Sequence, residues 1–171
     1  MVETVVPPPD LVALAGPDDA GYREGFVAQC RSTGDVPRTA EAWARATLEQ
    51  APRSMRETML RAWPLLGIHL GPVGSPDHVH GWRILRNDPD AIVLGVESSV
   101  VGTVRIVLRV EGDARPTLAW AMLIRYHGLR GRAAWAAIGP VHRPFVRRLL
   151  DVVTGPDRFP VTAAGGSVPP V

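Results

Sequence analysis

The feature that most constrains this fold is the last long apolar stretch of the chain, which runs from Gly128 to Val153. Its large side chains recur at alternating steps of three and four residues, the spacing that gathers side chains on one face of a helix. They are Trp135, Ile138, His142, Phe145, Leu149 and Val152. Arg132, Arg143 and Arg147 fall mostly elsewhere on the same helix. We therefore predict one long helix whose apolar face must be covered by another layer.

Strand-like patterns supply that layer. Four runs come directly before the helix, at residues 82–86, 91–97, 103–111 and 117–127, and an earlier run lies at 22–30. Alternation is clearest between Thr103 and Glu111, where every second side chain is a large aliphatic one. The connections between the later runs are short, which is typical of antiparallel neighbours. The pattern predicts an antiparallel meander with one face against the helix.

Two short helices are predicted between the first strand and the meander. Thr39 is a suitable N-cap for the first. Ser54 and Glu57 have the spacing of a capping box for the second, which should end near Pro64. In the last helix, Pro140 and Pro144 predict a kink of more than about 20°, because proline removes a hydrogen bond and crowds the preceding turn.

Several stretches then carry a resemblance to a known group of proteins. They are Gly81–Leu85, Ile92–Gly95, Gly131-Arg132 and Pro140-Val141-His142. Together with the order of elements, they resemble the SRPBCC superfamily, with its START-like and birch-pollen-allergen-like helix-grip fold. Within it, the chain is similar to an uncharacterised family, sometimes found behind reductase or epimerase domains, whose strongest motif is Gly-Arg followed by Pro-aromatic-His. Here Val141 replaces the aromatic residue.

The resemblance implies an α+β fold in which a curved antiparallel sheet wraps around a long, kinked C-terminal helix and leaves a cavity between them. It implies no established activity. With 171 residues, the chain fits one domain. We expect an extended N-terminal lead-in over residues 1–21, the helix-grip domain over 22–154 and a flexible tail over 155–171.

Composition excludes several classes of function. All 19 basic residues are arginine, so no lysine is present for Schiff-base or P-loop chemistry. The net charge of +2 and the interspersed acidic residues do not favour nucleic-acid binding. The sequence shows no signal peptide, no apolar run long enough for a membrane span and a single cysteine, so we expect a cytoplasmic protein. Nothing in the sequence indicates the oligomeric state.

The predicted cavity gives the candidate site. We expect its ligand to contact His142, Trp120, Trp135, Tyr126, Arg132, Ile138 and Phe145. His142 lies on the apolar stripe, and two interpretations stay open: a polar group that bonds a ligand or exchanges protons with it, or a buried neutral histidine bonded to a protein group.

Two other groups of polar residues are candidates for a binding site. His69, His78 and His80 lie near one another in the sequence, but their spacing matches no known zinc signature, so we expect no metal and no cofactor. Tyr126 and Arg132 stand at the start of the last helix, where an anion is favoured by the helix dipole. The alternative is that Arg132 pairs with an acidic side chain.

Three functions are compatible with this fold. The first is binding of a small hydrophobic or amphipathic molecule, which we favour over catalysis. The second is a cyclase or dehydratase acting on a polyketide-like substrate with His142 and Tyr126. The third is an interaction or assembly protein whose cavity is filled by its own side chains. An enclosed cavity of about 300 Å³ or more would favour the first two.

Overall fold

The computed structural model describes residues 1–16, 19–32, 36, 39–112 and 115–156. One antiparallel sheet dominates it, with the strand order β1-β2-β7-β6-β5-β4-β3. The strands are β1 (Val2–Val5), β2 (Tyr22–Gln29), β3 (His78–Val79), β4 (Trp82–Asn87), β5 (Ala91–Ser98), β6 (Gly102–Glu111) and β7 (Thr117–Tyr126). The helices are α1 (Pro9–Leu14), α2 (Ala40–Leu48), α3 (Arg53–Leu65) and α4 (Gly128–Val153). The predicted α+β helix-grip fold is confirmed.

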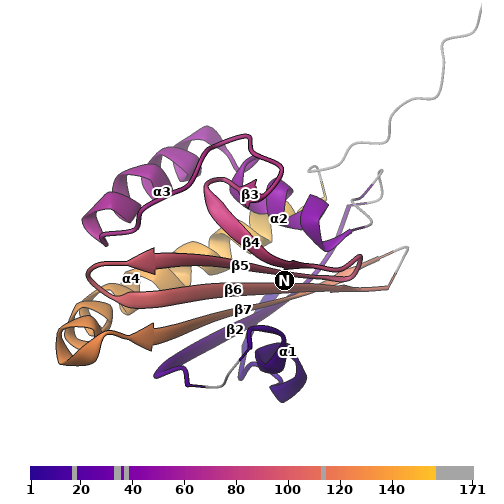
Figure 1. Cartoon of the computed structure of the whole chain (residues 1–171). Coiled ribbons are helices and arrows are strands. Elements are labelled where there is room, and N and C mark those ends of the chain that lie inside the picture. Colours follow the sequence, from indigo (N-terminus) through magenta and orange to yellow (C-terminus); the bar gives the residue numbers. More distant parts are fainter. Residues whose placement is uncertain (17–18, 33–35, 37–38, 113–114, 157–171) are drawn as a thin grey trace, which may run out of the picture.

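Helices lie on both faces of the sheet. Figure 1 shows α2, α3 and α4 on one side of the strands and α1 on the other. The inner face forms the main core, in which the alternating aliphatic side chains of β6 meet Trp120 and Met122 of β7 and Leu149 of α4. The predicted inward face of β6 is therefore confirmed. In the described residues, no helix is long and apolar enough to cross a membrane.

The N-terminal segment differs from the expected extended lead-in. β1 pairs with β2 in register Val2 with Ala28, and α1 follows it. Pro9 begins α1, because a proline at the first helical position loses no hydrogen bond. Leu11 and Val12 then pack against the outer face of the sheet, which β6 and β7 supply with apolar side chains. The three consecutive prolines led to the prediction of an extended lead-in, so the packing of this segment on the outer face was not predicted.

The two predicted short helices are present. Thr39 caps α2 by accepting a hydrogen bond from the Ala42 backbone at 3.2 Å, as predicted. The predicted capping box of α3 is wrong: the helix already begins at Arg53, after Pro52, and has no side-chain cap. Ser54 is thus inside the helix, where its carbonyl accepts a bond from the Thr58 hydroxyl.

Helix α4 is continuous from Gly128 to Val153 and contains both Pro140 and Pro144. Both prolines are exposed, so water can reach the side of the helix on which backbone bonds are lost. The size of any bend at this point remains a prediction. Leu149 is buried at 2% exposure, as the apolar stripe requires, whereas Phe145 is only partly buried. Of the predicted tail, only Gly155 and Pro156 belong to the described residues.

Candidate functional site

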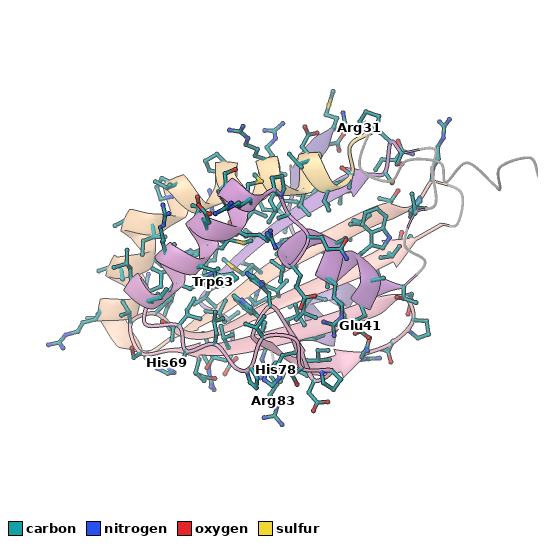
Figure 2. The ribbon with its side chains drawn as sticks, turned by 90° about the horizontal axis from the view of Figure 1, so that it is seen from above. Arg31, Glu41, Trp63, His69, His78 and Arg83 are labelled. Atoms are coloured by element: carbon teal, nitrogen blue, oxygen red, sulfur yellow. The ribbon has the colours of Figure 1, made fainter. Side chains whose placement is uncertain are left out.

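An apolar cavity of about 180 Å³ lies between the inner face of the sheet and helices α3 and α4. Figure 2 views these two helices from above, where they lie across the strands, and labels Trp63 of α3. Five of the seven predicted ligand residues line the cavity: Trp120, Trp135, Ile138, His142 and Phe145. Among the described lining residues, His142 is the only titratable side chain.

The mouth of the cavity lies between α3 and α4. Thr58 of α3 and Val141 of α4 both line the cavity and are exposed to solvent, Val141 at 72%. Val141 stands where the resembled motif has an aromatic residue. A larger side chain at this position would cover more of the mouth, so its replacement by valine keeps the entrance wider.

The other two predicted ligand residues, Tyr126 and Arg132, do not line the cavity. They lie in a separate groove of about 500 Å³, which also contains Tyr22, Gly139 and Arg143. Trp135 contributes to both the groove and the cavity. None of the ion pairs between described residues includes Arg132, so the alternative pairing with an acidic residue is not seen.

The Gly-Arg motif has a packing role. Gly131 lies in the first turns of α4, against the turn between β5 and β6. A Cβ atom at this position would lie 2.4 Å from the Val101 carbonyl oxygen, closer than side chains come to backbone. Glycine therefore allows α4 to approach the sheet here, which sets the depth at which Trp135 enters the core.

His142 has a protein partner that sequence reasoning missed. Its Nδ1 lies 2.9 Å from Oε1 of Glu24, whose side chain is only 2% exposed. The two atoms are close enough for an ion pair, but their alignment falls outside hydrogen-bond geometry. Of the two open interpretations of His142, pairing with a protein group is therefore present. The same imidazole still lines the cavity.

Strand β2 places Glu24 on the inner face. Tyr22, Glu24 and Phe26 share that face because side chains alternate along a strand, and Phe26 belongs to the main core. The signal in the sequence was an acidic residue at an inward position of an apolar strand. Since buried carboxylates are rare without a partner, such a position indicates a polar contact from another element.

Tyr22 and Arg143 complete the polar cluster around Glu24. The Tyr22 hydroxyl donates to Glu24 Oε2 at 2.8 Å and accepts from Arg143 Nε at 3.0 Å. Arg143 Nε is also 3.6 Å from Glu24 Oε2. Burial, reinforced by the bond to the carboxylate, raises the pKa of Tyr22. Tyr22 thus keeps its proton and remains a donor to Glu24.

Aromatic contacts join this cluster to the cavity wall. The ring of Trp135 lies 5.5 Å from that of Tyr22 in an edge-to-face arrangement and 5.0 Å from the imidazole of His142. The indole therefore fixes the position of both polar residues from one side. The predicted contact of Trp135 with a ligand is compatible with this arrangement, since the same side chain lines the cavity.

The other histidines lie away from the cavity. His78 is at the edge of the sheet, where β3 pairs with β4, and its Nδ1 is 3.3 Å from the Ser75 hydroxyl (Figure 2). His80 is buried against Trp63, with 5.4 Å between ring centroids. In the ranges that the structure describes, no group of three His, Cys, Asp or Glu residues has an arrangement able to hold a metal ion.

Comparison with protein families gives one match. The model of the family described as "Protein of unknown function (DUF2867)" matches residues 44–149. The chain belongs to the DUF2867 family. The matched range includes His142 and the lining of the cavity on α3 and α4, but not Glu24. No curated protein matches the chain.

Solved structures give weaker similarities. A Rhodobacter sphaeroides protein is 17% identical, with a TM-score of 0.45, and covers 88% of this chain and 97% of its own. CalU16 from Micromonospora echinospora is 12% identical, with a TM-score of 0.43 and coverage of 94% and 87%. Ara h 8.0201 is 11% identical, with a TM-score of 0.38 and coverage of 77% and 98%. Similarities this low give no information on what the chain binds.

Proposed function

We propose that this protein binds a small hydrophobic or amphipathic molecule in the cavity between the sheet and α4. The observation that supports this most is the cavity itself. Its lining is almost wholly apolar, it opens between α3 and α4, and it presents a single imidazole. An apolar cavity with few polar groups is the usual form of a small-molecule site. This reading would also explain why a buried carboxylate supports that imidazole.

The size of the cavity limits the ligand. Its volume of about 180 Å³ is below the about 300 Å³ at which sites for drug-sized ligands begin. It is close to that of an engineered cavity of about 150 Å³ which binds benzene. We therefore propose a ligand, or the enclosed part of one, no larger than a single substituted ring. A polyketide-like substrate would need α3 and α4 to move apart.

The third function, an interaction protein with a filled cavity, is less well supported. The cavity volume of about 180 Å³ does not reach the about 300 Å³ that would favour the first two functions, so what supports binding is the apolar space that the side chains leave open. Other expectations from the sequence remain predictions. They are the cytoplasmic location, the absence of cofactor and nucleic-acid partners, and the position of relatives behind reductase domains.

A titration followed by NMR tests binding. Toluene, added to the ¹⁵N-labelled protein, should shift the indole signals of Trp82, Trp120 and Trp135, which line the cavity. The variant Ala62→Phe should abolish these shifts, because Ala62 lines the cavity and a phenyl group would occupy it. Leu60→Phe is the matched control, since Leu60 is on the same helix, is 44% exposed and lies outside the lining. Absence of shifts in the wild type, or equal shifts in Ala62→Phe, would contradict the proposal.

The second candidate is an enzyme, and the Glu24–His142 contact favours it. An imidazole backed by a carboxylate is a common arrangement for a general acid or base. Tyr126, the other residue expected to act, lies in the separate groove together with Tyr22, so His142 would have to act without a tyrosine in the cavity lining. Conversion of a bound compound by the wild type, lost in His142→Phe, would support catalysis. Recovery of the unchanged compound would leave binding alone.

A further inference from the structure

The Glu24–His142 contact bears on the chemistry of the ligand. We infer that the cavity selects a ring-sized molecule that carries a hydroxyl group, and that this hydroxyl donates a hydrogen bond to Nε2 of His142. This inference rests on the proposed binding function and goes beyond it by naming the polar group of the ligand.

The first step concerns the tautomer of His142. A carboxylate accepts hydrogen bonds and donates none, so the imidazole nitrogen beside it must carry a proton. Glu24 Oε1 lies 2.9 Å from Nδ1, out of line for a hydrogen bond but close enough for the carboxylate charge to favour the proton of a neutral ring on Nδ1. Nε2 then has a lone pair and acts as an acceptor.

The second step concerns what keeps Glu24 an acceptor. The Tyr22 hydroxyl donates to its other oxygen, and the guanidinium of Arg143 lies 3.6 Å from that same oxygen. Both contacts come from hydrogen-bond donors, so the carboxylate acts as the acceptor of this cluster. Because the Glu24 side chain is 2% exposed, water has little access with which to replace these contacts.

The third step concerns Nε2 itself. No hydrogen bond between described residues involves Nε2, and the buried nitrogen of this ring is Nδ1, so Nε2 keeps access to the cavity or to solvent. The imidazole lines a cavity whose other described walls are apolar, except for Thr58 at the mouth and the indoles of Trp82, Trp120 and Trp135, whose buried N–H groups have no hydrogen-bond partner in the described part of the chain. A ligand hydroxyl is the group that satisfies an acceptor in such surroundings, and it would also hold the ring in place against Glu24. A ligand with only acceptor atoms would set a lone pair against a lone pair.

The experiment compares compounds of nearly equal shape. p-Cresol and p-xylene differ by a hydroxyl in place of a methyl group, and benzaldehyde carries an acceptor without a donor. Dissociation constants are measured by NMR titration for the wild type, Glu24→Gln and His142→Phe. Glu3→Gln, a change in an exposed strand residue, is the control. The wild type and Glu3→Gln should bind p-cresol about fivefold to tenfold more tightly than p-xylene, the effect of one hydrogen bond.

Glu24→Gln tests the tautomer. A glutamine amide can donate to Nδ1, which moves the ring proton to Nε2 and turns that nitrogen into a donor. The affinity for benzaldehyde relative to that for p-cresol should then be several-fold higher in Glu24→Gln than in the wild type. His142→Phe should bind p-xylene and lose the preference for p-cresol. This second variant tests the inference even if Glu24→Gln does not fold.

Each result has a distinct meaning. If no compound binds the wild type, the proposed function fails together with the inference. Equal affinity for p-cresol and p-xylene would overturn the inference while cavity binding stands. Two results would overturn the assigned role of the Glu24–His142 contact. One is that Glu24→Gln binds the three compounds in the same order of affinity as the wild type. The other is that His142→Phe still prefers p-cresol.

Discussion

At the scale of single residues, the account depends on the contact between Glu24 and His142. The apolar stripe of the last helix placed His142 on the inner side, and in the structure its side chain lines the cavity. Its partner was not found, because the two residues belong to opposite ends of the chain and no local spacing connects them. The fold brings them together by pairing β2 with β7 and laying α4 across the inner face.

This contact predicts how His142→Phe affects stability. The change leaves the buried Glu24 without one partner, so the free energy of unfolding should fall by about 1–3 kcal/mol. The double variant Glu24→Leu/His142→Phe should recover much of this loss, because an apolar pair replaces a buried polar one. Urea unfolding of the three variants and the wild type measures both effects. An unchanged stability in His142→Phe would show that Glu24 does not depend on this imidazole.

His80 gives a prediction on pH. Its side chain is buried at 7% exposure, and this burial lowers the pKa of His80 from its ordinary value, although the nearby Glu49 acts in the opposite direction. In the unfolded chain a histidine takes up a proton near pH about 6.5, whereas the folded His80 resists it. The stabilising contribution is therefore complete above that pH and is lost as the pH falls below it.

A variant can isolate this contribution. His80→Asn should reduce the loss of stability between neutral pH and pH about 5, since asparagine does not titrate there. Asparagine also tolerates the positive φ of 50° found at this position. His69→Asn, in an exposed loop position, is the control. Thermal melting across this range would contradict the prediction if His80→Asn and the wild type lost stability equally.

At the scale of elements, most strands and helices were predictable, and the exceptions have physical causes. Alternation located β2 and β4 to β7, and the three-four spacing located α4. β1 and α1 were missed because prolines dominate their surroundings. Yet β7 carried a signal for α1: its run of apolar residues is nearly continuous, which is typical of a strand buried on both faces. The kink expected at Pro140 remains a prediction for a crystal structure to measure.

Two positions on α4 should respond differently to truncation. Leu149→Ala should lower the free energy of unfolding by about 2–5 kcal/mol, because Leu149 is 2% exposed in the main core. Phe145→Ala should lower it by less than the about 3–5 kcal/mol of a fully buried phenylalanine, since Phe145 is partly exposed and faces the cavity. Chemical denaturation of both variants checks the order. A larger loss for Phe145→Ala would mean that the cavity is closed around this ring.

At the scale of the whole molecule, the helix-grip architecture leaves a space between its layers that is apolar, small and open at one side. The sequence predicted this arrangement through its order of elements, and five cavity residues through the apolar stripe and the last strand. The cavity volume was not predictable, because it depends on how three helices and a sheet pack. The position of Tyr126 and Arg132 in the separate groove was not predictable either, because it depends on how the end of β7 and the start of α4 are placed.

The central claim, that this cavity holds a small ligand, is tested most directly by native mass spectrometry of the protein purified from the cells that naturally produce it. The account predicts a second species, heavier than the chain by the mass of one ring-sized molecule, which organic extraction releases. Ala62→Phe, expressed in the same cells, should lack that species, and Leu60→Phe should keep it. The claim would be contradicted if the wild type showed only the mass of the chain. It would also be contradicted if Ala62→Phe showed the same added mass as the wild type.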